Sequence, residues 1–464
     1  MQEHIPATAT LAERLAETSV ALTLDVLPRP VIDHARHLFL DLLGAALAGA
    51  DTVEAGAALA AVTKLSPGGG PCTLWGTAAT ASPAAAALYN GILAHARELD
   101  DFGGVDHSGA VVVPTLLAIA EAFPPLSGRR LLEAMIVGYE VGRRVLDSAG
   151  GYRPHNHGDG YHSTGSCGSF AAAAAAAKAL GLDRRQTTWA LGLAGSVTGG
   201  TWAFLVDGAM GKRYNVGRAA ENGLVAACLA QQGFTGPAHV FEAEWGGFLG
   251  TCARSSQLPE ELVCSRPPGY GILRSGIKPY AACRDIHSSL DVVLELRERH
   301  RLRPEDIAAI EIRLIPEMMQ MIGARDFPAT RIEAQLNLPY SVAVALVAGR
   351  AFTGEYEPPW LHHPEVRRLA ALVRLVESPE LPFDSEPYLR LMATDGQSYE
   401  GHVDFASGAP QNPLPAQRIV AKFEALAGRT LPAAAVATLR DMALAVEEVG
   451  DLGEVARLLR AGDR

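Results

Sequence analysis

Apolar and small residues recur at intervals of three and four positions through the first half of the chain. The pattern runs from about residue 9 to about residue 252, and glycine closes most of its segments. This spacing places apolar side chains on one face of a helix. The sequence therefore predicts a long series of helices, with strand patterns only in the second half.

One of these helices carries seven consecutive alanines within "DGYHSTGSCGSFAAAAAAAKALGL". Alanine has the highest helix propensity and almost no side-chain volume, so neighbouring backbones can approach such a helix closely. We expect it inside a larger bundle. Ser163 and Thr164 are the natural caps of its first turn.

The pattern changes between about residues 265 and 276, where prolines and glycines indicate a linker. A helix follows in "SSLDVVLELRERH", and the alternation of "IAAIEIRLIP" predicts a strand. Asp395 and Gly396 supply the turn of a predicted hairpin. The last stretch, about 415 to 460, is helical again and is expected to return to the first domain.

These elements predict a mainly α protein with two domains. A large all-helical domain is expected from residues 1–267 and 407–464. A smaller α+β lid domain is expected between them, from residues 268–406. The length of 464 residues fits this division, because single cores rarely grow beyond 250–300 residues.

Charge, cysteine spacing and the absence of long apolar runs exclude several classes of protein. The formal net charge is −11, with no block of Lys or Arg, which argues against a nucleic-acid partner. The six cysteines lie far apart, without zinc-type spacing, and reduced thiols fit better than disulfides. The N-terminus lacks a signal-peptide pattern, and no apolar run reaches about 18 residues. We expect a cytoplasmic protein without a membrane segment.

Four basic or titratable side chains share a local context, because each lies at the expected start of a helix. They are His107, His162, Lys212 and Lys278. A helix start presents unpaired N–H groups that favour an anion. Each residue alone is at least as consistent with a structural or solvated role. If the four converge, they form a pocket for a substrate with two or three carboxylates.

Asp100 and Asp101 end a predicted helix, where the helix dipole disfavours acids. They could orient a histidine or a lysine, although solvent exposure explains them nearly as well. The cluster of His155, His157 and His162 lacks a carboxylate or cysteine set at helical spacing, so we predict no metal site. No G-x-G-x-x-G, Walker or G-x-S-x-G motif is present. Proton transfer by unassisted side chains is the chemistry that remains.

The order of several motifs resembles the MmgE/PrpD family. They are "NGILAHARELDD", "HSGAVVVPTLLAIAE", "YHSTGSCGSFAAAAAAAKALGL", "GKRYNVGRAAENGLVAACLAQQGFTGP" and "KPYAACRDIHSSLD". The resemblance covers about residues 30 to 430. It implies a helical domain with a smaller lid, a homodimer, and a site between the domains that needs no metal or organic cofactor. Ser108 and Ser163 stand where members often carry proline, which concerns the identity of the substrate.

The resemblance, together with the helix starts, assigns roles to individual residues. Lys212 and Lys278 would hold carboxylates, and His162 would act as general base or acid. His107, oriented by Asp100 or Asp101, would be its partner. Tyr161 could donate a proton to a leaving hydroxyl. A second carboxylate clamp on the lid side would comprise Arg284 and His287, which could equally flank their helix.

The expected reaction is proton transfer at a carbon next to a carboxylate of a small polycarboxylate. Dehydration of the 2-methylcitrate type is the first expectation, by analogy with the family. Epimerisation or decarboxylation of a related substrate, such as iminodisuccinate or cis-aconitate, is the alternative. A carboxylate-binding protein without turnover also remains open.

Overall fold

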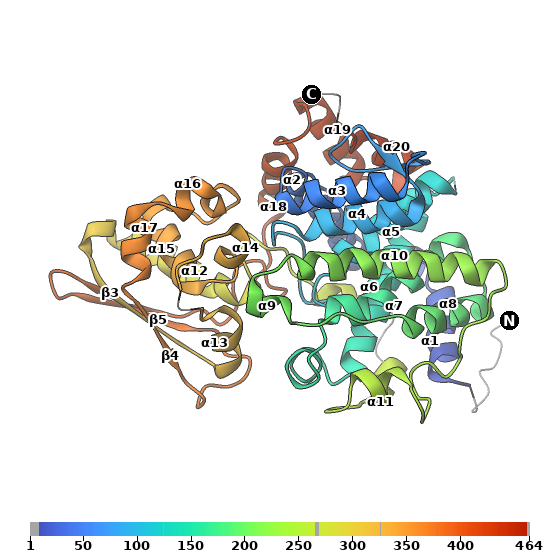
Figure 1. Ribbon diagram of the computed structural model, residues 1–464, viewed down its shortest axis with the longest axis horizontal. Helices are drawn as coiled ribbons and strands as arrows, with labels where there is room; N and C mark the ends of the chain where they lie inside the picture. Colours follow the sequence, from blue (N-terminus) through green and yellow to red (C-terminus); the bar gives the residue numbers. More distant parts are fainter. Residues whose placement is uncertain (1–8, 124, 265–268, 325, 462–464) are drawn as a thin grey trace.

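The chain folds into a large helical lobe and a smaller lobe that contains a sheet (Figure 1). The computed structural model describes residues 9–123, 125–264, 269–324 and 326–461. Helices dominate and strands are few, so the predicted mainly α class is confirmed. Where the two domains divide stays a prediction, and both residues of its first boundary, 267 and 268, lie outside the described residues.

The large lobe contains the helices from both ends of the chain. They are α1 (Leu11–Ala21), α2 (Arg29–Gly49), α3 (Val53–Leu65), α4 (Pro83–His95), α5 (Ser108–Ala122), α6 (Gly128–Ser148), α7 (Ser163–Leu180), α8 (Arg184–Ser196), α9 (Phe204–Asp207), α10 (Gly211–Gln231), α11 (Phe248–Cys252), α18 (Ala416–Ala427), α19 (Ala433–Leu444) and α20 (Gly453–Leu458). Short 3₁₀ and π turns lie between several of them.

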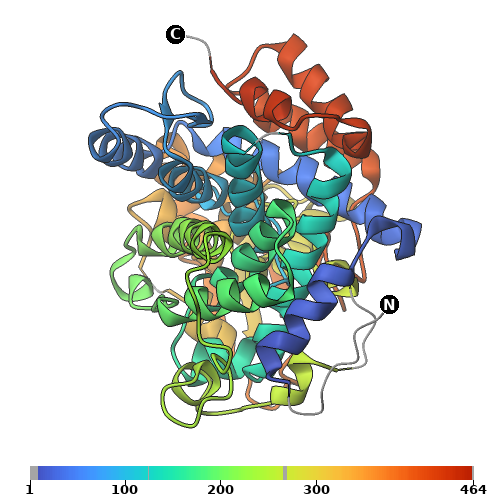
Figure 2. The same ribbon diagram turned by 90° about the vertical axis from the view of Figure 1, so that its right-hand side faces the viewer.

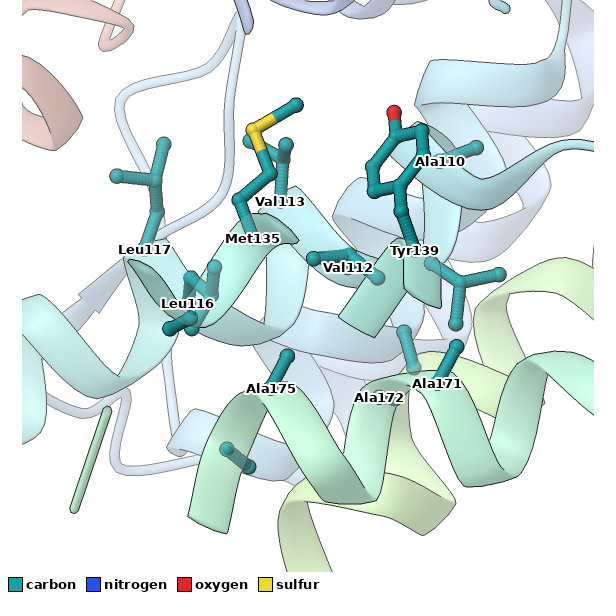
Figure 3. Packing of buried hydrophobic residues seen from close by; sticks show 14 of the residues in the cluster. Ala110, Val112, Val113, Leu116, Leu117, Met135, Tyr139, Ala171, Ala172 and Ala175 are labelled. Carbon is teal, nitrogen blue, oxygen red and sulfur yellow. The ribbon is translucent and has the colours of Figure 1, made fainter. Parts of the chain in front are cut away.

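The alanine helix α7 lies at the centre of this lobe, as its composition predicts. Figure 3 shows Ala171, Ala172 and Ala175 among the side chains of α5 and α6. A Cβ added to Gly223 of α10 would lie 2.3 Å from the Cβ of Ala172, so the two helices cross almost backbone to backbone. Side chains of one methyl group are what this spacing allows.

The described part of the smaller lobe contains six α-helices and a four-stranded sheet. The helices are α12 (His287–His300), α13 (Pro316–Ile322), α14 (Arg331–Ala334), α15 (Leu338–Ala348), α16 (Pro358–Leu361) and α17 (Pro364–Ala370); the strands are β3 (Ile307–Leu314), β4 (Val373–Glu377), β5 (Tyr388–Ala393) and β6 (Ser398–Gly401). Their order is β4-β3-β5-β6, with β3 and β4 parallel and the other pairs antiparallel.

The sheet confirms the predicted strand at β3 and the hairpin of β5 and β6, in which Gly396 takes a φ of 86°. Ile310 pairs with Val373 on one side and Leu391 on the other, which fixes the register of the central strand. The expectation of strands only in the second half is wrong. A short antiparallel pair, β1 (Cys72–Thr73) and β2 (Thr80–Ala81), lies in the large lobe, and two-residue strands are too short to leave a periodic pattern.

The chain returns to the large lobe at its end, as expected. Figure 2 shows the red C-terminal helices beside the blue helix α2. Ile419 and Phe423 of α18 belong to the core of the large lobe, whereas Leu426 belongs to that of the small lobe, together with Ala48 of α2. The two cores therefore meet along α2 and α18.

Within the described residues, no single helix has the length and apolar character needed to cross a membrane. The consecutive helices α2 and α3 meet these criteria only as a pair, with a bend of 86° between them.

Candidate active site

The connection between α4 and α5 carries most of the acidic site residues. We define the acidic turn as residues 98–101, which follow the end of α4 at His95. Glu98 has a φ of 53°, and Asp106, further along the same connection, has a φ of 99°. Both values lie in a backbone region that side chains rarely adopt. Such strain persists where the surroundings fix the local structure, and it gathers at functional sites.

Glu98 joins the two predicted lysines. Its Oε1 lies 2.6 Å from Nζ of Lys212, in the first turn of α10. Its Oε2 lies 3.1 Å from Nζ of Lys278, in the segment that leads into the small lobe. All three side chains are at most 4% exposed. Burial opposes the charge of Glu98, but Lys212 and Lys278 hold the pKa of this carboxyl well below its usual value.

Asp100 links two histidines. Its Oδ1 lies 3.0 Å from Nδ1 of His95, and its Oδ2 lies 3.0 Å from Nδ1 of His107. The two imidazole rings are 4.1 Å apart between centroids. Burial lowers the pKa of His107, but Asp106 and Asp100 outweigh burial and raise it overall. Burial dominates for His95 and lowers its pKa to about 3, so His95 is neutral.

Asp101 faces away from this pair into the helical core. Its Oδ1 accepts a hydrogen bond of 2.9 Å from the backbone N–H of Gly109, in the first turn of α5. Burial, together with the charge of Asp100, raises the pKa of Asp101 to about 7. Its backbone carbonyl lies 3.0 Å from Nδ1 of His107. Asp100 therefore orients His107 through its side chain, and Asp101 does so through its backbone.

His162 is the N-cap residue of α7, with no side-chain capping bond, so neither Ser163 nor Thr164 takes the expected capping place. The Nε2 of His162 is buried and has no hydrogen-bond partner among the described residues. Its ring lies against Trp202, at 4.9 Å between centroids. Burial, followed by the charge of Lys212, lowers the pKa of His162 well below its usual value. The imidazole is therefore neutral at physiological pH.

Lys212, His107 and Glu98 all lie close enough to His162 to act on its pKa, so the predicted histidines and lysines form one cluster. His107 and His162 lie at the starts of their helices as expected, without side-chain capping bonds, and Lys278 precedes α12. Lys212 differs, because α10 already begins at Gly211 and Lys212 lies inside its first turn. The cluster is closed to solvent. A cavity of about 190 Å³ adjoins it at Asn215, whose Nδ2 lies 3.4 Å from Nδ1 of His162.

Three predicted residues have other partners. The Cys252 thiol lies beside the Tyr161 hydroxyl and raises its pKa. Arg284 forms a two-pronged ion pair with Glu386, with a distance of 2.9 Å for one of its contacts. The remaining residue, His287, is buried, and its Nε2 lies 3.1 Å from the carbonyl oxygen of Ala282.

The structure adds three members that the sequence analysis did not assign to the site. Glu98 and His95 lie in and beside the predicted helix end, where a histidine on an apolar face is typical of a core position. Arg213 is 1% exposed, lies 3.5 Å from Glu98 and donates to Gln335 Oε1 at 3.2 Å. Its signal in the sequence was adjacency to Lys212, since consecutive basic residues inside a helix seldom both become buried.

His95, Glu98 and His107 place one ligand atom each within 4.8 Å of one another, a spacing that could hold a metal ion. The surrounding charges favour another use. Glu98 already contacts the ammonium groups of Lys212 and Lys278, and a bound cation would be repelled by both. The cluster is better suited to bind an anion. Glu98 neutralises part of the positive charge of the lysines and so determines how much of it is left for a ligand.

Two family models match successive parts of the chain. Residues 13–260 match the model of the MmgE/PrpD N-terminal domain, and residues 280–448 match that of the MmgE/PrpD C-terminal domain. The chain is 29% identical to the cis-aconitate decarboxylase-like protein oryM of Aspergillus oryzae, over 93% of this chain and 94% of that protein. It is also 29% identical to the cis-aconitate decarboxylase of Aspergillus terreus, over 94% and 93% of the two chains.

The two family models together span most of the chain, and the segment between them contains the linker that precedes Lys278. The residues of the buried cluster lie in the first matched part, apart from Lys278, which lies in the segment between the two matches. The predicted resemblance is therefore confirmed, and this chain belongs to the MmgE/PrpD family.

Proposed function

We propose that this protein is an enzyme that decarboxylates a small unsaturated tricarboxylate of the cis-aconitate type by proton transfer. The observation that carries the proposal is the convergence of Lys212 and Lys278 on one buried carboxylate, beside two histidines of opposite protonation tendency. The names of the relatives support decarboxylation over the dehydration that we expected first from the sequence.

The lysines supply the binding energy for substrate carboxylates. Lys212, Lys278 and Arg213 bring three positive charges to the cluster, and Glu98 offsets one of them. Negative charge that develops on a substrate carboxylate is stabilised most strongly in a buried site with fixed cations. Because the cluster is closed, the substrate enters when the lobes separate, and its carboxylates then compete with Glu98 for the lysines.

The two histidines have different roles in proton transfer. His107 has a raised pKa and is held through Nδ1 by Asp100, so its Nε2 can deliver a proton. Neutral His162, with its unpartnered Nε2, can accept one. The local surroundings thus separate the two pKa values and assign acid and base.

The reaction needs no change of oxidation state. The bond between the CH₂ carbon and its carboxyl group breaks, His162 takes the proton of that carboxyl group, and carbon dioxide leaves. The released electron pair forms the new double bond to the central carbon, and the former vinyl carbon takes one proton from His107. Negative charge develops transiently on the carboxylate of the former vinyl carbon. Lys212 and Lys278 would hold this carboxylate and stabilise the charge.

Dehydration requires in addition a group that protonates a leaving hydroxyl. We expected Tyr161 in this role, and its hydroxyl contacts Cys252 instead. This placement gives less support to dehydration than to decarboxylation.

Proton NMR in heavy water tests the proposal with cis-aconitate, citrate, 2-methylcitrate, malate and iminodisuccinate as a panel. We expect cis-aconitate to yield carbon dioxide and a methylene dicarboxylate with one deuteron at the former vinyl carbon. Water addition or loss would show a dehydratase instead. Deuterium exchange without net conversion would show an epimerase, and thermal stabilisation without any exchange a binding protein.

We further propose that the protein is a homodimer, on the basis of the outward face of α10. We define the α10 stripe as Met210, Tyr214, Arg218, Glu221, Val225 and Leu229. Tyr214 is 55% exposed and the other three apolar members about 40%. The outward face of a helix is usually polar, so four exposed apolar side chains along one stripe support a covered surface.

The α10 stripe is self-complementary. Its members pair about a point between residues 219 and 220, so a second copy running antiparallel would place Tyr214 against Val225 and Arg218 against Glu221. A two-fold interface requires this reciprocity. The cavity beside Asn215 opens next to Tyr214 and Arg218, and a second copy would cover it. A cytoplasmic location and independence of a cofactor remain predictions from the sequence.

A further inference from the structure

Lys422, on helix α18 near the C-terminal end of the chain, contacts the backbone of the acidic turn. The buried residues of α18 include Ile419, Lys422, Phe423 and Leu426, with the spacing of an apolar stripe. Lys422 therefore occupies a core position, where its side chain is 5% exposed. A buried lysine in such a stripe requires partners for its charge.

The ammonium has two partners. Nζ donates a hydrogen bond of 2.7 Å to the backbone carbonyl of Leu99 and lies 2.7 Å from Oδ1 of Asp41, on α2. Leu99 is the residue between Glu98 and Asp100. The lysine thus binds the backbone of the turn itself, at the point where one neighbour contacts the substrate lysines and the other orients His107.

Lys422 completes a set of contacts that fixes every residue of the acidic turn. Glu98 is held by Lys212 and Lys278, Asp100 by the two histidines, and Asp101 by the N–H of Gly109; only the Leu99 carbonyl needs Lys422. Because Glu98 has a strained φ, the turn depends on these contacts to keep its shape.

We propose that Lys422 is a positioning residue for the reaction, and that its hydrogen bond to the Leu99 carbonyl holds Asp100 in the geometry that orients His107. The inference rests on the proposed function, since it assigns His107 to proton transfer. Lys422 itself contacts neither of the substrate-binding lysines.

Another role for Lys422 is simple neutralisation of buried Asp41. The two roles separate in the double variant Asp41→Asn/Lys422→Met, which removes both charges and leaves the local net charge unchanged. If Lys422 only neutralises Asp41, this variant keeps full activity. If Lys422 positions the turn, the Leu99 carbonyl is still unbound and activity falls.

The experiment compares Lys422→Met, Asp41→Asn and the double variant with the wild-type chain, by steady-state kinetics and thermal unfolding. We expect kcat of the double variant to fall about 10-fold or more, with KM changed less than about 2-fold because Lys212 and Lys278 are intact. Lys422→Met leaves Asp41 buried without a partner and can fail to fold. The double variant avoids leaving a buried charge without a partner. Wild-type kcat in the double variant overturns the proposal.

A second measurement does not depend on turnover. The NMR titration of the His107 imidazole, assigned with His107→Gln, should show its pKa lowered by about 0.5–1 unit in the double variant, because a displaced Asp100 stabilises the imidazolium less. An unchanged titration overturns the positioning role. If the wild-type chain converts none of the carboxylates, the proposed function fails and this titration still decides the role of Lys422. The other groups that act on His107 are unaltered in these variants: Asp106, Asp101, Lys278 and His95.

Discussion

Glu98 and Lys212 form a buried ion pair, with 2.6 Å between Oε1 and Nζ, that connects a strained turn to the first turn of α10. A carboxylate of the protein thus lies where we expect a carboxylate of the substrate to bind. Substrate binding is then an exchange of one carboxylate for another at the same ammonium groups.

The first prediction concerns Lys212. Lys212→Met should lower kcat/KM by about 10²–10³-fold, since it removes a fixed cation from the site of developing negative charge. It should also destabilise the fold by about 3–5 kcal/mol, because Glu98 loses its closest partner. Steady-state kinetics and denaturant unfolding measure the two effects. Exposed Lys64 provides the control, and Lys64→Met should change neither.

The second prediction separates the two histidines from the binding lysines. His107→Gln and His162→Gln should each lower kcat by about 10²–10⁴-fold, as expected for loss of a general acid or base. Binding of the substrate, followed by calorimetry, should change little, because Lys212 and Lys278 remain. The same substitution at exposed His300 is the control. Equal losses of binding and kcat would argue that the histidines hold the substrate rather than transfer protons.

The third prediction concerns pH. The pKa of His107 is raised, and its protonated form is the proposed acid, so kcat should fall as pH rises through that pKa. Asp106 makes the largest contribution among the charges that raise it. Asp106→Asn should therefore move the fall in kcat to lower pH. Asparagine suits this position, because it tolerates the positive φ of residue 106. A pH profile that moves upward, or stays, would contradict the assignment of His107 as the acid.

The fourth prediction tests the close approach of α4 and α10. A Cβ at Gly217 would lie 2.3 Å from the carbonyl oxygen of Leu88, so Gly217→Ala should destabilise the fold by about 1–3 kcal/mol or more. The shift of α10 should also displace Lys212 and raise KM. Gly56→Ala on α3 is the matched control, because nothing lies within 4 Å of its added Cβ and alanine favours a helix. Thermal unfolding and steady-state kinetics of the two variants test this prediction.

The fifth prediction concerns the α10 stripe. Arg218→Glu and Glu221→Arg should each weaken the proposed dimer, because each places like charges opposite one another across the two-fold axis. The double variant restores opposite charges and should recover the dimer. Sedimentation at several concentrations measures the equilibrium. Single variants that sediment like the wild type would exclude this surface as the interface.

Much of the helical framework could be predicted from sequence, because apolar spacing and alanine content report directly on burial. His107 and His162 lie at the starts of their helices as expected, and Lys278 lies before α12. Convergence could not be predicted, since Lys212 and Lys278 meet only through Glu98. The direction of the Tyr161 side chain depends on its neighbour Cys252, far along the chain.

His95 and Lys422 show a second limit. Each occupies a position in an apolar helical pattern, and the sequence alone gives no reason to separate it from the core around it. Their importance comes from atoms of the acidic turn, Asp100 and the Leu99 carbonyl, that contact them only in the folded chain. The strained φ of Glu98 could likewise not be predicted, because the residue at this position is not glycine.

The alanine segment of α7 has a consequence for how relatives of this protein can diverge. Where helices touch through backbone atoms, as at Ala172 and Gly223, a larger side chain cannot be absorbed by repacking its neighbours. The distance from His162 to Lys212 is thereby nearly fixed by main-chain geometry. New substrate preferences must arise from the connections between helices and from the small lobe, while the scaffold beneath the histidines stays unchanged.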